Sequence, residues 1–358
     1  MRLQLTRSAS RALVGAVLVA GSAGADGDVQ PDARVGLYQD SDHTTVWTMT
    51  SGVNATVAER AVVGARYLVD VVSSASVDVV TQATGRFHDT RHDISGNAGY
   101  KDDERSISAN YSYSVENDWR SHNAGITATH DFFEHNLVLD AAFGIQQNTI
   151  TRSHSIGFER ELRVYLSSFA ATYTLTPRDL LQASLAVSFL NGFQSSPYRY
   201  LFIEGRAVLE NYPEHRWRHA LVLRHHHYFD GGWALRSNAR LYTDTYGVEA
   251  VTVGNEAVFE LAPFDLTLQW RGYAQTRASF YQKEYASVQQ FMSIDKELSS
   301  FVDVFAGPAL GYGGTSIGPF DTLRIDARIS GFYFYYFDFA RLRDRYGVMT
   351  DVGISGSF

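Results

Sequence analysis

Apolar and polar side chains alternate along much of this chain with the period of a β-strand. In one such stretch the odd-numbered residues from 181 to 189 are all apolar, whereas Gln182, Ser184 and Ser188 are polar. The same alternation recurs in further stretches, at 61–71, 106–116, 137–146, 266–271 and 323–330. Because successive side chains of a strand point to opposite faces, each stretch predicts a strand with one apolar and one polar face.

A soluble β-sandwich shows the same period, so other features must separate it from a membrane barrel. Several alternating runs are longer than the usual five or six residues of a strand in a soluble sheet. Tight turns alternate with long polar connections, at 176–179, 230–232 and 262–265 against 148–161, 191–215 and 277–293. Aromatic residues crowd the segment 332–339 (FYFYYFDF), as expected for an interfacial girdle. Together these features favour a barrel in a membrane.

We therefore expect an all-β protein, a transmembrane antiparallel up-and-down β-barrel of about 14 strands, within a range of about 12 to 16. The expected strands are 43–55, 60–72, 105–115, 121–132, 136–147, 162–175, 179–190, 217–228, 233–245, 249–261, 265–276, 294–306, 322–337 and 346–358. Connections of an up-and-down barrel alternate between its two ends. Counted in this way, the short connection 56–59 falls at the end with the long loops, and the long connection 73–104 falls at the end with the tight turns. A further strand within 73–104 or at 34–40 would remove that conflict.

Residues 1–25 have the composition of a secretory signal peptide. Basic residues and a short apolar run at 12–20 precede the small residues of a signal-peptidase site, Ala23, Gly24 and Ala25. The run is shorter than the roughly 20 residues that span a bilayer as a helix. We expect cleavage after Ala25, a periplasmic N-terminal segment at 26–42 and a barrel domain at 43–358. The expected location is the outer membrane of a Gram-negative cell.

Charge and cysteine content limit the possible functions. The chain has 39 acidic and 31 basic residues, a formal net charge of −8, which predicts no nucleic-acid partner. It has no cysteine, so we expect no disulfide, thiolate site or lipid-modified cysteine. No cofactor and no enzymatic reaction are expected.

The C-terminal segment alternates and ends on an aromatic residue, Phe358. A terminal phenylalanine of this kind resembles the sorting signal that the barrel-assembly machinery reads. We therefore expect Phe358 to act as an assembly signal, with that machinery, outer-membrane lipid and lipopolysaccharide as partners.

Six short stretches outside the regular alternation carry a distinctive set of residues. They are 73–80 (SSASVDVV), 114–119 (SVENDW), 196–199 (SPYR), 212–216 (YPEHR), 271–281 (RGYAQTRASFY) and 293–298 (SIDKEL). The set resembles a bacterial family catalogued as domain of unknown function 3570. The resemblance implies an outer-membrane barrel and no catalytic residues. Because members occur beside small exported redox-related proteins, it also implies an envelope redox partner. Trp119 stands where the family has tyrosine, a harmless change if the residue lies at a membrane interface.

Two histidine pairs and one serine motif are candidates for chemistry. His225 and His227 share one face of an expected strand, so their two imidazoles could bind one metal ion. Such binding would be weak, because a closed metal site needs three or four ligands. His88 and His92 would face together on a helical turn and could hold a divalent metal. Each pair is otherwise explained as polar residues of a rim or a loop. The segment 314–318 fits the G-x-S-x-G nucleophile pattern, but it lies in a glycine-rich turn with no helical period.

Charged residues at inward-facing positions predict a wet or ion-paired lumen, because an unpaired charge in a dry interior costs many kcal/mol. A tight turn near Tyr246 would bring Arg236 level with Glu256, and the turn at 262–265 would bring Glu256 level with Arg271. We therefore predict one belt across three strands, Arg236–Glu256–Arg271. Further inward charges are expected at Arg324, Asp326 and Arg328. Both a wall-stabilising role and a pore-lining role fit these residues.

The sequence thus predicts a barrel that passes small solutes across the outer membrane, passively or with ligand selectivity. One alternative is a non-conducting structural or docking barrel that serves an envelope redox or metal-handling system. A barrel hydrolase is a third alternative, which lacks a convincing serine, histidine and acid set.

Overall fold

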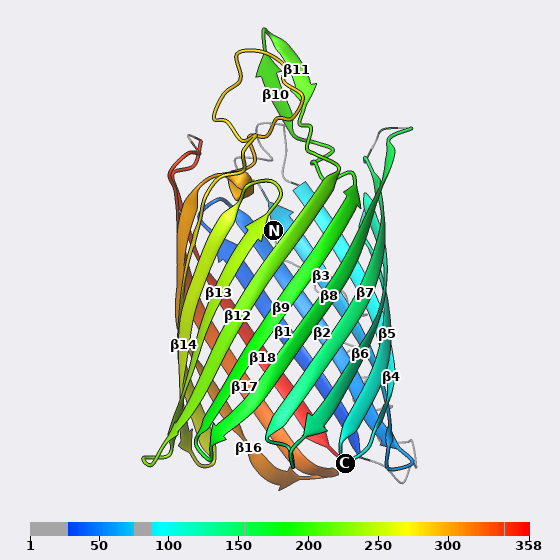
Figure 1. The fold of residues 1–358 in the computed structure, drawn as a ribbon, viewed down its shortest axis with the longest axis vertical. Helices are drawn as coiled ribbons and strands as arrows, with labels where there is room; N and C mark the ends of the chain where they lie inside the picture. Colours follow the sequence, from blue (N-terminus) through cyan, green and yellow to red (C-terminus); the bar gives the residue numbers. More distant parts are fainter. Residues whose placement is uncertain (1–27, 75–86, 154, 156, 340) are drawn as a thin grey trace.

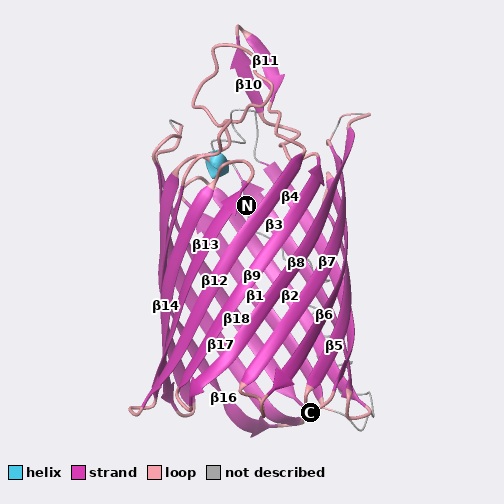
Figure 2. Cartoon of the chain, viewed as in Figure 1, coloured by secondary structure: helices cyan, strands magenta, loops and turns pink. Residues whose placement is uncertain are grey.

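Sixteen strands close into one antiparallel barrel in the part of the chain that the computed structural model describes, residues 28–74, 87–153, 155, 157–339 and 341–358 (Figures 1 and 2). Their bounds are β1 Val29–Asp40, β2 Thr44–Val57, β3 Ala61–Ser74, β4 Phe87–Lys101, β5 Arg105–Val115, β6 Trp119–Phe132, β7 Leu137–Thr151, β8 Glu159–Thr176, β9 Asp179–Gly192, β12 His215–Phe229, β13 Trp233–Asp244, β14 Glu249–Leu261, β15 Phe264–Gln275, β16 Phe301–Ile317, β17 Phe320–Tyr336 and β18 Asp344–Ser357. Strands adjacent in this order pair, and β1 pairs with β18 to close the ring. The expected signal peptide and its cleavage site lie outside the described residues.

The outward face of the wall is apolar, as the alternation predicted. Leu139, Phe143 and Ile145 of β7 expose 40%, 50% and 43% of their surface, although each lies in the middle of a paired strand. Because no protein layer covers these side chains, the acyl chains of a membrane are their expected surroundings. No helix among the described residues is long and apolar enough to cross a membrane.

The strand count is 16 instead of about 14 because two segments with weak apolar patterns are strands. The first, β1, lies within the segment 26–42, so the prediction that this segment precedes the barrel is wrong: the described barrel begins at Val29. The second, β4, lies within 73–104 and presents Thr90, His92 and Gly96 at outward positions, which hides its alternation. With both strands added, the short connection after β2 joins the tight turns, and the conflict in the predicted topology disappears.

The two ends of the barrel differ. At the turn end, each connection has two to four residues, and the C-terminus lies there (Figure 1). The backbone N–H of Phe358 donates to the carbonyl of Val29, 3.1 Å away, so the first and last strands meet at this end. Short turns of this kind are the periplasmic connections of outer-membrane barrels. At the loop end lie the longest connections of the described chain, 193–214 and 276–300.

These two long loops form a folded cap over the loop end, and we call residues 193–214 and 276–300 the cap. The first loop carries a hairpin of β10 (Tyr200–Ile203) and β11 (Arg206–Leu209), which projects beyond the barrel (Figure 2). The second carries the 3-10 helix η1 (Lys296–Leu298), so the expected strand 294–306 begins at Phe301 instead. Asn211 and Met292 exchange backbone hydrogen bonds of 3.1 and 2.8 Å and join the loops.

The aromatic segment 332–339 does not lie wholly at the membrane interface. Tyr333 and Phe337 point outward and are 46% and 56% exposed. Phe332 and Tyr336 alternate with them, point inward and are only 8% and 2% exposed. Only the outward residues of this segment can therefore contribute to the predicted girdle, while the inward residues line the lumen with aromatic rings.

Candidate functional site

The lumen wall carries the predicted charges, and one half of the predicted belt is present. Arg236 lies directly opposite Glu256, with 3.7 Å between Nη1 and Oε2. Glu256, however, lies opposite Gln269 and not Arg271. The turn from β14 to β15 closes between Leu261 and Phe264. The partner of Glu256 on β15 is therefore two residues earlier in the chain than predicted. A two-residue slip keeps the same face of the strand, so Arg271 still points inward.

Arg271 instead pairs with the next strand, where Asp303 lies 2.6 Å from its Nη2. Sequence reasoning missed this partner because the strand containing Asp303 was expected to begin at 294, without a defined register. The belt is therefore two separate pairs, Arg236–Glu256 and Arg271–Asp303, on neighbouring parts of the wall.

The charges of β17 lie among ion pairs of the wall, one of which crosses the closure of the barrel. Arg324 pairs with Asp265 at 2.7 Å. Arg34 Nη2 lies 2.7 Å from Asp326, and its Nη1 contacts Asp351. Arg328 is opposite Asp351 in the β17–β18 register. Because Arg34 belongs to β1, which lay outside the predicted set of 14 strands and was named only as a possible extra strand, its role could not be read from the alternation.

One side of the lumen is rich in arginine. The inward face of β12 and β13 carries Arg218, Arg224 and Arg240, which form no ion pair with another described residue. Arg224 donates to the side-chain oxygen of Gln182, and the guanidinium of Arg240 lies 5.3 Å from the ring centroid of Tyr242. These strands border a cavity of about 500 Å³ that Arg218, Arg240 and Tyr242 help to line.

The opposite side of the lumen carries both signs of charge. In the closed order β12 and β13 are separated by half the ring from β2 and β3. The inward face of β3 carries Arg66 and Asp70, and that of β4 carries Asp89, Arg91 and Asp93, with Arg91 4.0 Å from Asp93. The arginine-rich wall therefore faces a wall of nearly balanced charge, which leaves a positive potential on its own side of the lumen.

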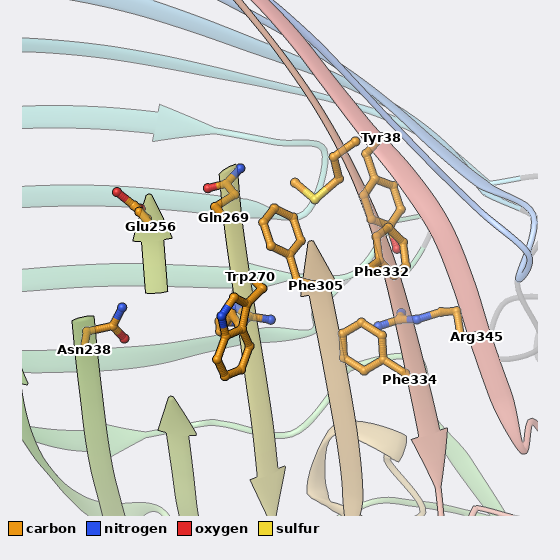
Figure 3. Close-up of a pocket in the computed structure, with 11 residues that line it drawn as sticks. Tyr38, Asn238, Glu256, Gln269, Trp270, Phe305, Phe332, Phe334 and Arg345 are labelled. Atoms are coloured by element: carbon orange, nitrogen blue, oxygen red, sulfur yellow. The ribbon is translucent and has the colours of Figure 1, made fainter. Parts of the chain in front are cut away.

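A second cavity, of about 410 Å³, lies against the wall formed by β13 to β18 and β1 (Figure 3). Rings of Tyr38, Phe305, Phe332 and Phe334 border it, and polar groups of the Arg236–Glu256 region complete its lining. The guanidinium of Arg345 lies 4.4 Å from the centroid of the Phe334 ring, within cation–π range. The cavity thus offers aromatic and cationic contacts together, which the outward-girdle interpretation of this segment did not anticipate.

The cap reaches across the mouth. Its η1 helix contacts the β1–β2 loop through Lys296 and Asp42, 3.6 Å apart. The same stretch of the cap borders a cavity of about 290 Å³ together with Trp119, Leu162 and Leu190 of the wall. Trp119 therefore faces the lumen, not the membrane interface expected for it, and its indole N–H donates to Asn148 Oδ1 at 2.9 Å.

A buried carboxylate joins the two loops of the cap. The Glu210 side chain has no exposed surface, and its oxygens accept from Arg199 at 3.2 Å, Tyr212 at 2.8 Å and the Ile294 backbone N–H at 2.7 Å. Ser293 Oγ donates to it at 3.2 Å. Burial raises the pKa of the Glu210 carboxyl above its ordinary value, and burial raises the pKa of the Tyr212 hydroxyl well above 10. Sequence patterns could not reveal this contact, because its partners come from loops about 80 residues apart.

The histidine pairs have different outcomes. His88 and His92 lie four residues apart on β4, a strand and not the expected loop, so their backbones are about 13 Å apart. That separation is too large for one ion, and His92 instead contacts the Tyr67 hydroxyl at 2.7 Å. His225 and His227 share the outward face of β12, and both contact Asp179 of β9, at 3.0 and 2.6 Å.

The G-x-S-x-G segment lies in a strand hairpin. Ser316 belongs to the end of β16, and its hydroxyl donates to the carbonyl of Phe320 at 3.2 Å. A nucleophile elbow needs a strand, a sharp turn and a helix. This segment has no such helix, so the motif lacks the context that would activate its serine.

Comparison with known proteins places this geometry in a family and a fold. The family model described as "Protein of unknown function (DUF3570)" matches residues 81–164 and 159–311. The curated protein sequences yield no match. Among solved structures, a bacterial polysaccharide outer membrane secretin is similar with a TM-score of 0.52 and 10% identity, over 93% of this chain and 98% of that one. CdiB from Acinetobacter baumannii is similar with a TM-score of 0.53 and 8% identity, over 92% of this chain and 60% of its own length. At these identities the likeness shows the fold alone, that of an outer-membrane barrel.

Proposed function

The chain belongs to the DUF3570 family, and from its outer-membrane barrel fold we propose that it passes small polar solutes across the outer membrane. One observation carries the proposal. The inward-facing arginines of the wall pairs expose 41–49% of their side chains, although they lie inside a closed ring. Inward side chains with that much free surface line an open, wet space, whereas a packed interior would cover them.

The excess of arginine on one wall suggests which solutes pass. Arg224 and Arg240 point into the lumen and form no ion pair with another described residue, although Arg224 donates to Gln182 and Arg240 lies over the Tyr242 ring. An anionic solute gains from this positive wall, and the gain is larger in the lumen than in bulk water where low-dielectric walls surround the solute. Passage is therefore proposed to be selective for charge and not for a single ligand.

A non-conducting docking barrel is the second candidate, and the cap is the observation that favours it. Its two loops form apolar clusters around Tyr212 and Tyr285 that cover the mouth. A mouth closed in this way would leave the barrel silent and its cap available to an envelope redox partner. The two functions differ in whether ions cross.

Single-channel recording in planar bilayers tests the proposal. We expect ionic current steps from the purified barrel, and larger or more frequent steps from Glu210→Ala, in which the two cap loops lose their buried carboxylate contact. Heat-modifiable migration on gels would show that each sample is folded. If both proteins are folded and neither conducts, passage is wrong and the docking function is favoured.

A further inference from the structure

We propose that Asp179, His225 and His227 form a binding site for a divalent transition-metal ion of the zinc class on the outer surface of the barrel. His225 Nε2 and His227 Nδ1 lie 3.0 and 2.6 Å from the same oxygen of Asp179. One ligand atom from each of the three residues lies within 4.8 Å of both others. The site is separate from the lumen and adds to the proposed passage without depending on it.

The backbone explains why these three side chains meet. His225 and His227 are two residues apart on β12 and therefore share a face. His227 lies directly opposite Asp179 in the β12–β9 register, and His226 points to the lumen side, opposite Arg236. Strand pairing fixes the arrangement, so the ligands are held by the wall and do not depend on a mobile loop.

The ligand set suits a zinc-like ion. Zinc binds imidazole nitrogen and carboxylate oxygen at about 2.0–2.2 Å, which places neighbouring tetrahedral ligands roughly 3.3 Å apart. The observed separations from Asp179 are close to this value, so small side-chain rotations would admit the ion. A neutral imidazole can carry its proton on either nitrogen, so both rings can direct a lone pair to the metal. Two histidines and one aspartate leave a fourth position for water.

A further contact orients the carboxylate. Thr176 Oγ1 donates to the second oxygen of Asp179 at 2.6 Å, which leaves the first oxygen directed at the two imidazoles. Outer contacts of this kind orient metal-binding carboxylates in known sites. The carboxylate is held in place before any ion arrives.

The position of the site gives a physical reason for a cation there. On β12, Leu221 and Leu223 lie on the same outward face, and on β9 Leu181 does so next to Asp179. Beyond the histidines, Phe229 and Trp233 stack with 3.9 Å between ring centroids, as aromatic residues do at a membrane interface. Asp179 is therefore an acid at the edge of the lipid-facing band, where an unneutralised charge costs up to about 1 kcal/mol. A bound dication would neutralise it and link β9 to β12.

Metal titration of the full-length barrel tests the site. The protein, without a polyhistidine tag, would be purified in detergent, stripped with a chelator and titrated with Zn²⁺ by calorimetry and with Co²⁺ by visible absorption. We expect one ion per chain and the absorption of tetrahedral Co²⁺. His225→Gln, His227→Gln and Asp179→Asn should each weaken binding by roughly tenfold or more, in line with the sensitivity of metal sites to loss of their supporting groups.

His219→Gln is the matched control, because His219 lies on the same face of β12 and stacks on Trp217 at the far end of the strand. It should leave binding unchanged. The proposal is overturned if the wild-type barrel binds no Zn²⁺, or if His225→Gln and His227→Gln, folded by heat modifiability, bind as the wild type does. Preference for Ca²⁺ over Zn²⁺ would also overturn it, since it would assign binding to acidic side chains elsewhere.

Discussion

Ion pairs of the lumen wall and ion pairs at the capped mouth use the same side chains in different surroundings. In the lumen, Arg236 and Glu256 expose 49% and 40% of their side chains. At the mouth, Arg199 and Glu210 expose 15% and 0%. Water reaches the first pair and not the second. The comparison teaches that one chemical contact serves two purposes here: exposed pairs shape the field of the lumen, and buried pairs hold the mouth in one arrangement.

The energetics of the two classes differ accordingly. An exposed pair contributes about 0.2–1 kcal/mol, because solvent screens it. Breaking a buried pair by removing one partner costs about 3–5 kcal/mol, because the other charge remains without its counter-charge. The cap should therefore respond strongly to single substitutions that the wall tolerates.

The largest effect is expected from Glu210→Ala. This substitution removes the carboxylate that accepts four hydrogen bonds in the cap. Arg199 then keeps Asp295 as its ion-pair partner. The free energy of opening the cap should fall by about 1–3 kcal/mol, because buried donors lose their acceptor while Arg199 keeps the counter-charge of Asp295. Hydrogen exchange of 193–214 and 276–300 measures this change, with Glu256→Ala as the exposed control. Equal protection in the two variants would remove the distinction between buried and exposed pairs.

A dependence of the cap on pH should follow from the same carboxyl. Its folded-state pKa is raised by burial, so its neutral form is favoured in the closed cap. The stability that it contributes is fully present below its ordinary pKa of about 4.5 and is lost as the pH rises through the raised value. Exchange protection of the cap should therefore fall over this window in the wild type. Glu210→Gln should lack that step; a step of the same size in the variant would assign the dependence to another group.

Substitution of the inward arginines of β12 and β13 should change the ion selectivity of the barrel and should affect its stability less than Glu210→Ala does. Arg218→Gln with Arg240→Gln removes two positive charges that form no ion pair with another described residue. The reversal potential in a salt gradient should shift toward cation preference. Arg324→Gln is the control, because Asp265 neutralises that arginine. A shift in the control as large as that in the double variant would show that the wall responds only to total charge.

The smallest effect is expected from Glu256→Gln. The pair with Arg236 is half exposed, so unfolding stability should change by about 0.2–1 kcal/mol. Denaturant unfolding in detergent measures the change, and conductance measures any effect on ions. A small stability change with altered selectivity would assign Glu256 to the field of the lumen. A loss of several kcal/mol would place it with the buried class.

Particular residues show how much of this molecule could be predicted. The strand at Leu181 to Phe189 could be predicted because alternate residues of a barrel strand face lipid and water, and are therefore alternately apolar and polar. His92 and Gly96 hid β4 because they place a polar and a small residue on its outward face, alongside apolar Ile94 and Ala98. The Arg236–Glu256 register followed from a turn that could be located, whereas Arg271 depended on a turn whose centre was one residue off.

The site residues at the mouth and the rim could not be predicted in the same way. Glu210 meets Ile294, and Asp179 meets His225, only after the ring has closed. Local alternation carries no information about such partners, because they depend on how non-adjacent segments of the chain are brought together. The inward half of 332–339 was missed for a related reason, since its rings fit either an interface or a cavity until the facing strand is known.

The pairing of β1 with β18 has a consequence for the order of events during biogenesis. The register joins Ala33 to Ile354 and Arg34 to Gly353, so the first strand of the chain acquires its second neighbour from the last. Until β18 has been made and has reached β1, both strands have an unsatisfied edge, and an exposed edge is a template for pairing with other chains. The ring of described strands therefore closes only after β18 has been synthesised. A truncation that removes β18 would leave the facing edges of β1 and β17 open.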